Sequence, residues 1–140
     1  MAALNETRNC ADIQTTFDGQ GYLVKYHANG ILKTAAVDDK PMGVTAAESS
    51  RDAAGSLEAA GTGTVAIYPL SGIVYVKCMA IASNVTKFGL PLYCSQTGDT
   101  DGLCDDDSSN SATPIGYYAG EDGLTITEGD LVPVFVVGHN

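Results

Sequence analysis

Short apolar runs separated by turn residues recur along the chain. Residues 22–26 and 31–35 are two such runs, and they flank an Asn29-Gly30 pair. Because both residues of this pair tolerate the positive φ of a type I′ turn, the pattern predicts a β-hairpin. A second hairpin is predicted from residues 64–68, the turn residues 69–72 and the run 73–78. Further strands are predicted at residues 42–45, 90–94, 115–118, 124–127 and 132–137.

Helix-forming patterns are scarce. Residues 46–60 are the one helix-permissive stretch, but they contain a single large apolar residue, Leu57, and a glycine at position 55. A helix that docks on a core needs apolar residues at i, i+3 and i+4, so we expect a short surface helix or an ordered loop there. Many short strands, at intervals of roughly ten residues, predict a mainly β fold, either a small barrel or a sandwich.

The segment before Gly21 is polar and weakly patterned. We therefore expect residues 1–20 to form an extended N-terminal arm that orders only where something docks it. Residues 21–140 are expected to form a single β-domain, because a chain of 140 residues has room for one domain with an ordinary core.

A Pro-apolar-Gly-apolar step occurs twice, at residues 41–44 and 114–117. In each copy the proline can open a strand at a position where no ladder donor is needed. The glycine can permit a bulge or a close backbone approach. The two steps therefore predict two similar strand starts, the alternative being chance coincidence in a glycine-rich β protein.

Charge and hydropathy argue against several classes of function. The chain carries 17 Asp and Glu against 7 Lys and Arg, a formal net charge of -10. A protein that grips nucleic acid needs clustered basic residues, and no basic stripe occurs here. Neither nucleic acid nor a membrane surface is therefore expected as a partner. No signal peptide is recognised at the start, and no apolar run approaches the roughly 18 residues of a membrane helix.

Catalytic motifs are hard to find. The two histidines, His27 and His139, lie beside the predicted hairpin turn and near the last residue. No Gly-x-Ser-x-Gly elbow, phosphate-binding glycine loop or His-Glu-x-x-His pattern occurs in the sequence. A cysteine nucleophile that meets either histidine in space remains open. We expect no enzymatic activity and assign no catalytic residue.

Four cysteines, Cys10, Cys78, Cys94 and Cys104, show no C-x-x-C spacing, which argues against a zinc site. Cys94 and Cys104 bracket a polar loop that follows a strand, and we predict a disulfide between them that closes an 11-residue loop. The loop-entropy model gives such a bond about 2.8 kcal/mol. The alternative is that all four cysteines are reduced. Cys78, at the end of an apolar run, resembles a small core hydrophobe.

Residues 99–107 form the most acidic segment of the chain. Closely spaced carboxylates repel one another unless a hard cation collects them, and Ca²⁺ takes six to eight such oxygens. The segment lacks the EF-hand pattern, since Gly102 comes too early and no glutamate closes the loop. A calcium site is one interpretation and a solvated acidic loop is the other; no further cofactor is expected. The candidate ligands are Asp99, Asp101, Asp105 and Asp107.

Seven short segments follow one another along the chain, at residues 29–35, 40–44, 63–67, 71–76, 89–93, 114–117 and 129–134. They supply an early strand, a Pro-apolar-Gly-apolar step, a central hairpin, a Gly-x-Pro-Leu-Tyr step, a second Ile-Gly strand and a closing run. In this order the chain resembles the head decoration, or cement, proteins of tailed viruses. The resemblance covers about 110 of the 140 residues. The acidic loop at 94–107 and the alanine-rich stretch at 46–60 depart from it.

The resemblance implies a compact β-tulip or small barrel on the outer surface of an icosahedral virion, where it stabilises the shell by binding the major capsid protein. It also implies a homo-oligomer, typically a trimer, and an arm that orders on the capsid by strand addition. The arm residues expected to bind the capsid are Asn5, Thr7, Asn9, Asp12, Ile13, Thr15 and Phe17. The tyrosines expected at the subunit interface, unless they serve ordinary core or strand packing, are Tyr22, Tyr26, Tyr68 and Tyr75.

A function of another class stays open: a calcium-stabilised β-domain that acts as a surface glycan-binding or adhesion module. Tyr93, Tyr117 and Tyr118 are the aromatic residues available around the 94–107 loop. Calorimetry with Ca²⁺ and with EDTA distinguishes the two functions, because an unchanged melting temperature would remove the metal-dependent one.

Overall fold

In the described part of the computed structural model, the regular secondary structure consists of β-strands. The structure describes residues 8–10, 13, 15–27, 30–33, 39–59, 61–82, 85–95, 102–107 and 113–137, with the backbone alone described for 8–10, 27, 30, 32 and 33. The strands in this part of the chain are β1 (Arg8–Cys10), β2 (Leu23–His27), β3 (Gly30–Lys33), β4 (Gly43–Thr45), β5 (Val65–Pro69), β6 (Ile73–Cys78), β7 (Pro91–Cys94), β8 (Cys104–Asp105), β9 (Gly116–Tyr118) and β10 (Asp130–Val136). Within the same ranges, no helix is long and apolar enough to span a bilayer.

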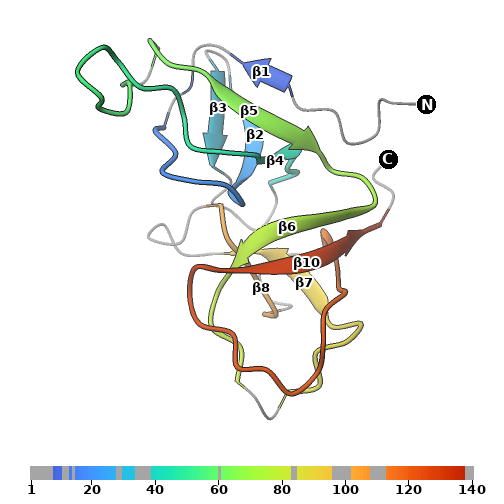
Figure 1. Ribbon diagram of the computed structural model, residues 1–140. Coiled ribbons are helices and arrows are strands. Elements are labelled where there is room, and N and C mark those ends of the chain that lie inside the picture. Colours follow the sequence, from blue (N-terminus) through green and yellow to red (C-terminus); the bar gives the residue numbers. More distant parts are fainter. Residues whose placement is uncertain are drawn as a thin grey trace.

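The strands form a five-stranded sheet and a closed barrel (Figure 1). The sheet has the order β1-β5-β4-β2-β3, and its pairs are antiparallel. The barrel has the order β10-β6-β8-β7-β9, and its pairs are antiparallel except for the parallel pair of β6 and β8. The predicted mainly β fold with a small barrel is confirmed.

One of the two predicted hairpins is confirmed. β2 and β3 pair as expected, with His27 opposite Gly30, so that the glycine already belongs to the second strand. The second prediction is wrong: β5 pairs with β1 and β4 in the sheet, whereas β6 pairs with β10 and β8 in the barrel (Figure 1). The two strands bury their alternate side chains in different cores, and this burial outweighs their closeness in sequence.

Most of the other predicted strands are present as β4, β7, β9 and β10. Residues 124–127 are the exception, because only Ile126 there forms a bridge, with Ile81. Residues 46–59 form a loop without a helix, in agreement with the missing apolar stripe.

Two clusters of buried side chains stabilise the two parts of the fold. The barrel core holds Leu23, Val44, Val74, Val76, Cys78, Ile81, Leu92, Cys94, Cys104, Ile115, Tyr118, Ile126, Val132, Val134 and Val136. The sheet core holds Ile13, Phe17, Tyr22, Val24, Ile31, Val65, Ile67 and Leu103.

The sheet core includes part of the segment that was expected to be a free arm. Ile13 and Phe17 are fully buried in it. Phe17 is also tied to the loop after β4, since its N–H donates to Ser49 Oγ at 3.0 Å and its carbonyl accepts from the Ser49 N–H at 2.8 Å. β1 pairs with β5 at the edge of the sheet. The β-domain therefore begins before Gly21 in this structure.

Gly21 joins the sheet to the barrel. Its N–H donates to the carbonyl of Thr45 on β4 at 2.9 Å, and its own carbonyl accepts from the N–H of Lys77 on β6 at 2.8 Å. A Cβ at this position would lie 2.3 Å from Leu131 Cδ2, and the φ of +97° favours glycine. The junction between the two parts of the fold therefore depends on a residue without a side chain.

The two Pro-apolar-Gly-apolar steps have the same role. Gly43 opens β4 between β2 and β5, and Gly116 opens β9 between β7 and β10. A Cβ would lie 2.7 Å from the Tyr68 carbonyl oxygen at Gly43 and 2.3 Å from the Phe135 carbonyl oxygen at Gly116. Both glycines thus allow a close backbone approach between strands, as the repeated motif predicted.

Candidate functional site

The outer surface of the barrel carries an apolar patch over β9, β10 and β6, which we name the barrel face. The residues of these strands alternate in direction, so that Val74 and Val132 point into the barrel core while their neighbours point outward. The members of the barrel face are Ile73, Tyr75, Tyr117, Leu131, Pro133 and Phe135.

Strand register makes the barrel face continuous. Phe135 lies opposite both Ile73 on β6 and Tyr117 on β9. Pro133 lies opposite Tyr75 in the next outward row. Side chains that face each other across neighbouring strands have Cβ atoms about 5 Å apart, so these rows form one surface rather than isolated exposed residues.

The barrel face is large for an uncovered apolar surface. The exposed fraction is 54% for Ile73, 57% for Tyr75 and 53% for Phe135. With the smaller contributions of Tyr117 and Leu131, the patch exposes on the order of 500 Å² of side chain. The largest apolar patch on a monomer commonly has about this size and is often functional, and the six members carry no charge although the chain has a net charge of -10.

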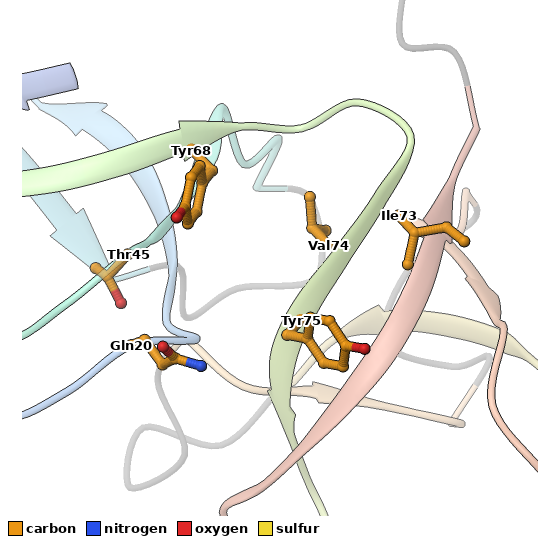
Figure 2. Close-up of a pocket in the computed structure, with 6 residues that line it drawn as sticks. All are labelled: Gln20, Thr45, Tyr68, Ile73, Val74 and Tyr75. Carbon is orange, nitrogen blue, oxygen red and sulfur yellow. The ribbon is translucent and has the colours of Figure 1, made fainter. Parts of the chain in front are cut away.

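A pocket of about 400 Å³ adjoins the barrel face where the sheet meets the barrel. Figure 2 shows Tyr68 of β5, Thr45 of β4 and Gln20 on one side and Ile73 and Tyr75 of β6 on the other. Four of the six lining residues are aromatic or aliphatic, and Gln20 and Thr45 add polar groups, which suits a side chain of a protein partner with both apolar and polar parts. The complete lining is Gln20, Thr45, Tyr68, Ile73, Val74 and Tyr75.

Three of the four tyrosines predicted at a subunit interface are exposed. Tyr68 and Tyr75 lie together at the pocket, and Tyr26 is 68% exposed on β2 in the sheet. Tyr22 is buried in the sheet core, and its hydroxyl donates a 2.6 Å hydrogen bond to Asp18 Oδ1. Its side chain therefore serves core packing in the single chain, because it presents almost no surface to a partner.

The environment of the Tyr22 hydroxyl is expected to make the stability of the protein depend on pH. Burial, followed by the hydrogen bond to Asp18, raises the pKa of Tyr22 to about 12. An unfolded tyrosine has a pKa near 10, so the stabilisation by the neutral hydroxyl is complete below pH 10 and is lost as the pH rises through 12. We expect the free energy of unfolding of the wild type to exceed that of Tyr22→Phe by about 1 kcal/mol at pH 7. Urea unfolding in steps from pH 7 to 12 should show this advantage falling above pH 10; a constant difference would contradict the assignment.

Only some of the seven expected capsid-binding residues can be placed. Ile13 and Phe17 are fully buried in the sheet core, and Thr15 is half-buried. The side chains of Ile13 and Phe17 therefore support the fold in this structure and offer no surface to a capsid. Asn5, Thr7 and Asp12 lie outside the described residues. Of Asn9 only the backbone is described, as part of β1.

The predicted calcium ligands are also divided. Asp99 and Asp101 lie outside the described residues. Asp105 and Asp107 are described, and Asp105 Oδ1 accepts a hydrogen bond from the Asp107 N–H at 2.9 Å. Among the residues that the structure describes, no group of three or more His, Cys, Asp or Glu side chains is placed to hold a metal ion. Calcium binding by this segment stays a prediction.

The tyrosines considered for a glycan site do not form one surface. Tyr117 belongs to the barrel face, whereas Tyr118 is buried in the barrel core and its hydroxyl donates to the Glu121 carbonyl at 3.1 Å. Tyr93 is partly buried on β7. The structure therefore gives no geometric support to a shared aromatic platform of these three side chains.

The structure brings Cys94 and Cys104 together without bonding them. They lie opposite each other in the register of β7 and β8, and both are buried and not disulfide-bonded, so the predicted disulfide is absent from this structure. Cys78 is a buried free thiol of the barrel core, as its apolar surroundings in the sequence indicated. It lies opposite Cys104 from β6. We name these three residues the thiol cluster.

Four members of the barrel face were missed by the sequence reasoning: Ile73, Leu131, Pro133 and Phe135. A signal for them exists, because residues 73–76 and 131–137 are apolar in both alternating phases. A strand with one solvated face alternates with polar residues instead. Two apolar phases predict that both faces are covered, and in the single chain only the inner face is.

The geometry thus points to an apolar contact surface with an adjoining pocket. Comparison with known proteins adds no relative: no protein-family model matches the chain, and no curated protein matches it.

Proposed function

We propose that this protein decorates the outer surface of an icosahedral capsid and stabilises the shell by binding the major capsid protein. In this proposal it acts as a homo-oligomer, a trimer by the resemblance described above, and it has no enzymatic activity. The observation that carries the proposal is the barrel face, an uncharged apolar surface on the outside of a small acidic domain.

The barrel face fits a contact between copies of this chain. Two chains with a net charge of -10 repel each other, so they associate most readily through a surface without carboxylates. Covering about 500 Å² of apolar surface favours association by roughly 12 kcal/mol before the entropic cost of association is subtracted. With the rims of the adjoining pocket, this area supplies much of the roughly 800 Å² per partner of a stable interface.

The order of segments supports the placement on a capsid. The steps shared with head decoration proteins run through the strands that build both the sheet and the barrel. An acidic surface suits a position that faces solvent rather than packaged nucleic acid. Trimers that span neighbouring capsomers would hold the shell through several weak contacts at once, which multiplies affinity without any single strong site.

The test compares a barrel-face variant with a matched surface variant. Tyr75→Ser with Phe135→Ser is expected to abolish the oligomer, because it removes two central aromatic contacts. With avidity lost, binding to shells of the major capsid protein should weaken by at least about 100-fold. Analytical ultracentrifugation measures the oligomer, and co-sedimentation with shells measures binding.

The control carries the same chemical change elsewhere on the surface. Phe88 and Leu124 are 70% and 52% exposed and lie outside the barrel face, so Phe88→Ser with Leu124→Ser should oligomerise and bind like the wild type. Equal behaviour of the two double variants would remove the barrel face as the interface. A wild-type chain that binds no shell and is missing from electron cryo-microscopy maps of the virion would refute the function itself.

A further inference from the structure

The thiol cluster lies where the barrel is closed by its shortest strand. β8 spans only Cys104–Asp105, yet it joins β6 to β7 in the closed barrel. Cys104 lies opposite Cys78 on the β6 side and opposite Cys94 on the β7 side. All three sulfur-bearing side chains are at most 2% exposed. One cysteine of the two-residue strand is thus within reach of a cysteine on either neighbour.

The two neighbours do not contact Cys104 equally. The neighbouring Cys78 thiol and, after it, burial raise the pKa of the Cys104 thiol well above its ordinary value, and Cys94 contributes least to this shift. The Cys94 thiol donates instead to the backbone carbonyl of Asp39, at 3.8 Å. The Cys94 sulfur is therefore engaged with the Asp39 carbonyl, whereas Cys78 is the neighbour that influences Cys104 most.

The backbone permits a bond on the β6 side. Neighbouring strands lie about 4.8 Å apart, and a disulfide needs Cα atoms separated by about 4.4–6.8 Å. The Met79 N–H donates to the Cys104 carbonyl at 2.8 Å, which fixes the register of β8 on β6 at this point. Both side chains point into the barrel core, so their sulfur atoms meet on the same side of the two strands.

We propose that Cys78 and Cys104 form a disulfide under oxidising conditions and that this bond closes the barrel covalently at β8. With glutathione disulfide as the oxidant, one cysteine thiolate attacks it and releases a first glutathione thiolate. The second cysteine thiolate then attacks the mixed disulfide and releases another. Two protein S–H bonds are lost, one protein S–S bond forms, and the two electrons and two protons end on two glutathione molecules.

The third thiol gives the site a choice of bonds. Cys104 can bond to only one neighbour at a time, and Cys94 lies opposite it as a thiol able to exchange. The raised pKa of Cys104 keeps it protonated at neutral pH, so the reaction proceeds when β8 opens locally from β6. If the chain is a capsid protein, as proposed above, release from a reducing cell into an oxidising medium would strengthen it after assembly; this consequence rests on the proposed function, whereas the bond does not.

Trypsin distinguishes the two bonds. No Lys or Arg follows Lys87, and Lys77 directly precedes Cys78. A bond between Cys78 and Cys104 therefore links peptide 78–87 to peptide 88–140. A bond between Cys94 and Cys104 stays inside peptide 88–140, which then only loses two hydrogen atoms. The isolated full-length chain with Cys10→Ser, which removes the fourth thiol, is equilibrated with glutathione disulfide, digested without reduction and analysed by mass spectrometry.

The expected product is the linked pair of peptides 78–87 and 88–140. The bond encloses 27 residues, so the melting temperature should rise by roughly 10 °C on oxidation and return on reduction. Cys94→Ala should keep both the link and the rise, whereas the matched Cys78→Ala should lose both. Fully free thiols at equilibrium, an internal bond in peptide 88–140 of the parent chain, or a rise that survives in Cys78→Ala would each overturn the proposal. None of these readouts requires a capsid, so failure here leaves the proposed function standing.

Discussion

Gly116→Ala is expected to destabilise the domain by about 3 kcal/mol, the upper part of the range for overpacked cores. The new Cβ would lie 2.3 Å from the Phe135 carbonyl oxygen and 2.8 Å from Val134 Cγ1. Gly116 pairs with Val136 on β10 and with Leu92 on β7. Because the nearest atom belongs to the backbone of a paired strand, the clash can be relieved only by separating strands of the barrel.

Urea unfolding measures this effect, and the midpoint should fall by about 2 M. Gly19→Ala is the matched control, since a Cβ there meets no atom within 4 Å; its stability should stay within about 0.5 kcal/mol of the wild type. Gly43→Ala, with its Cβ 2.7 Å from the Tyr68 carbonyl oxygen, should lie between the two. If Gly116→Ala unfolds at the same urea concentration as Gly19→Ala, the close approach of β9 and β10 is disproved.

Phe17→Ala is expected to cost about 4 kcal/mol in the isolated chain, as is typical of a large buried aromatic residue. Phe17 is fully buried in the sheet core, with its ring centroid 5.9 Å from that of Tyr22. The substitution would leave a cavity between the N-terminal segment and the sheet. Guanidinium or thermal unfolding of the purified chain, without any capsid, provides the measurement.

This experiment also separates two views of residues 1–20. A segment that orders only on a capsid would contribute nothing to the stability of the free chain, so Phe17→Ala would then unfold like the wild type. Thr16→Ala changes the exposed neighbour and should be close to neutral in either case. A large loss for Phe17→Ala alone would show that this part of the segment belongs to the domain before any partner binds.

The candidate site could be predicted only in part. Tyr68 and Tyr75 were named from the sequence, and the structure brings them to one pocket although their strands belong to different sheets. Phe135 was missed, because its exposure depends on which face of β10 is covered by another part of the chain. The alternation of apolar residues shows which side chains share a face of a strand, but it does not show which face another part of the chain covers.

The thiol cluster shows the same division. Spacing along the chain suggested Cys94 and Cys104, which the register of β7 and β8 does place opposite each other. Cys78 is far from both in sequence, and its position beside Cys104 follows from the parallel pairing of β6 with β8. A parallel pair needs a long connection, so no local pattern of residues can announce it.

The sequence by itself determined the properties that short-range physics controls. Apolar runs broken by turn residues gave strands, the Asn-Gly region placed a hairpin, and the repeated Pro-Gly steps marked Gly43 and Gly116 as points of close approach. Only the tertiary structure decided that β5 joins the sheet and β6 the barrel, that Phe17 is buried, and that one apolar face of the barrel stays uncovered. Those outcomes depend on long-range pairing, in which the total apolar surface buried by the chain outweighs the preference of neighbouring segments for each other.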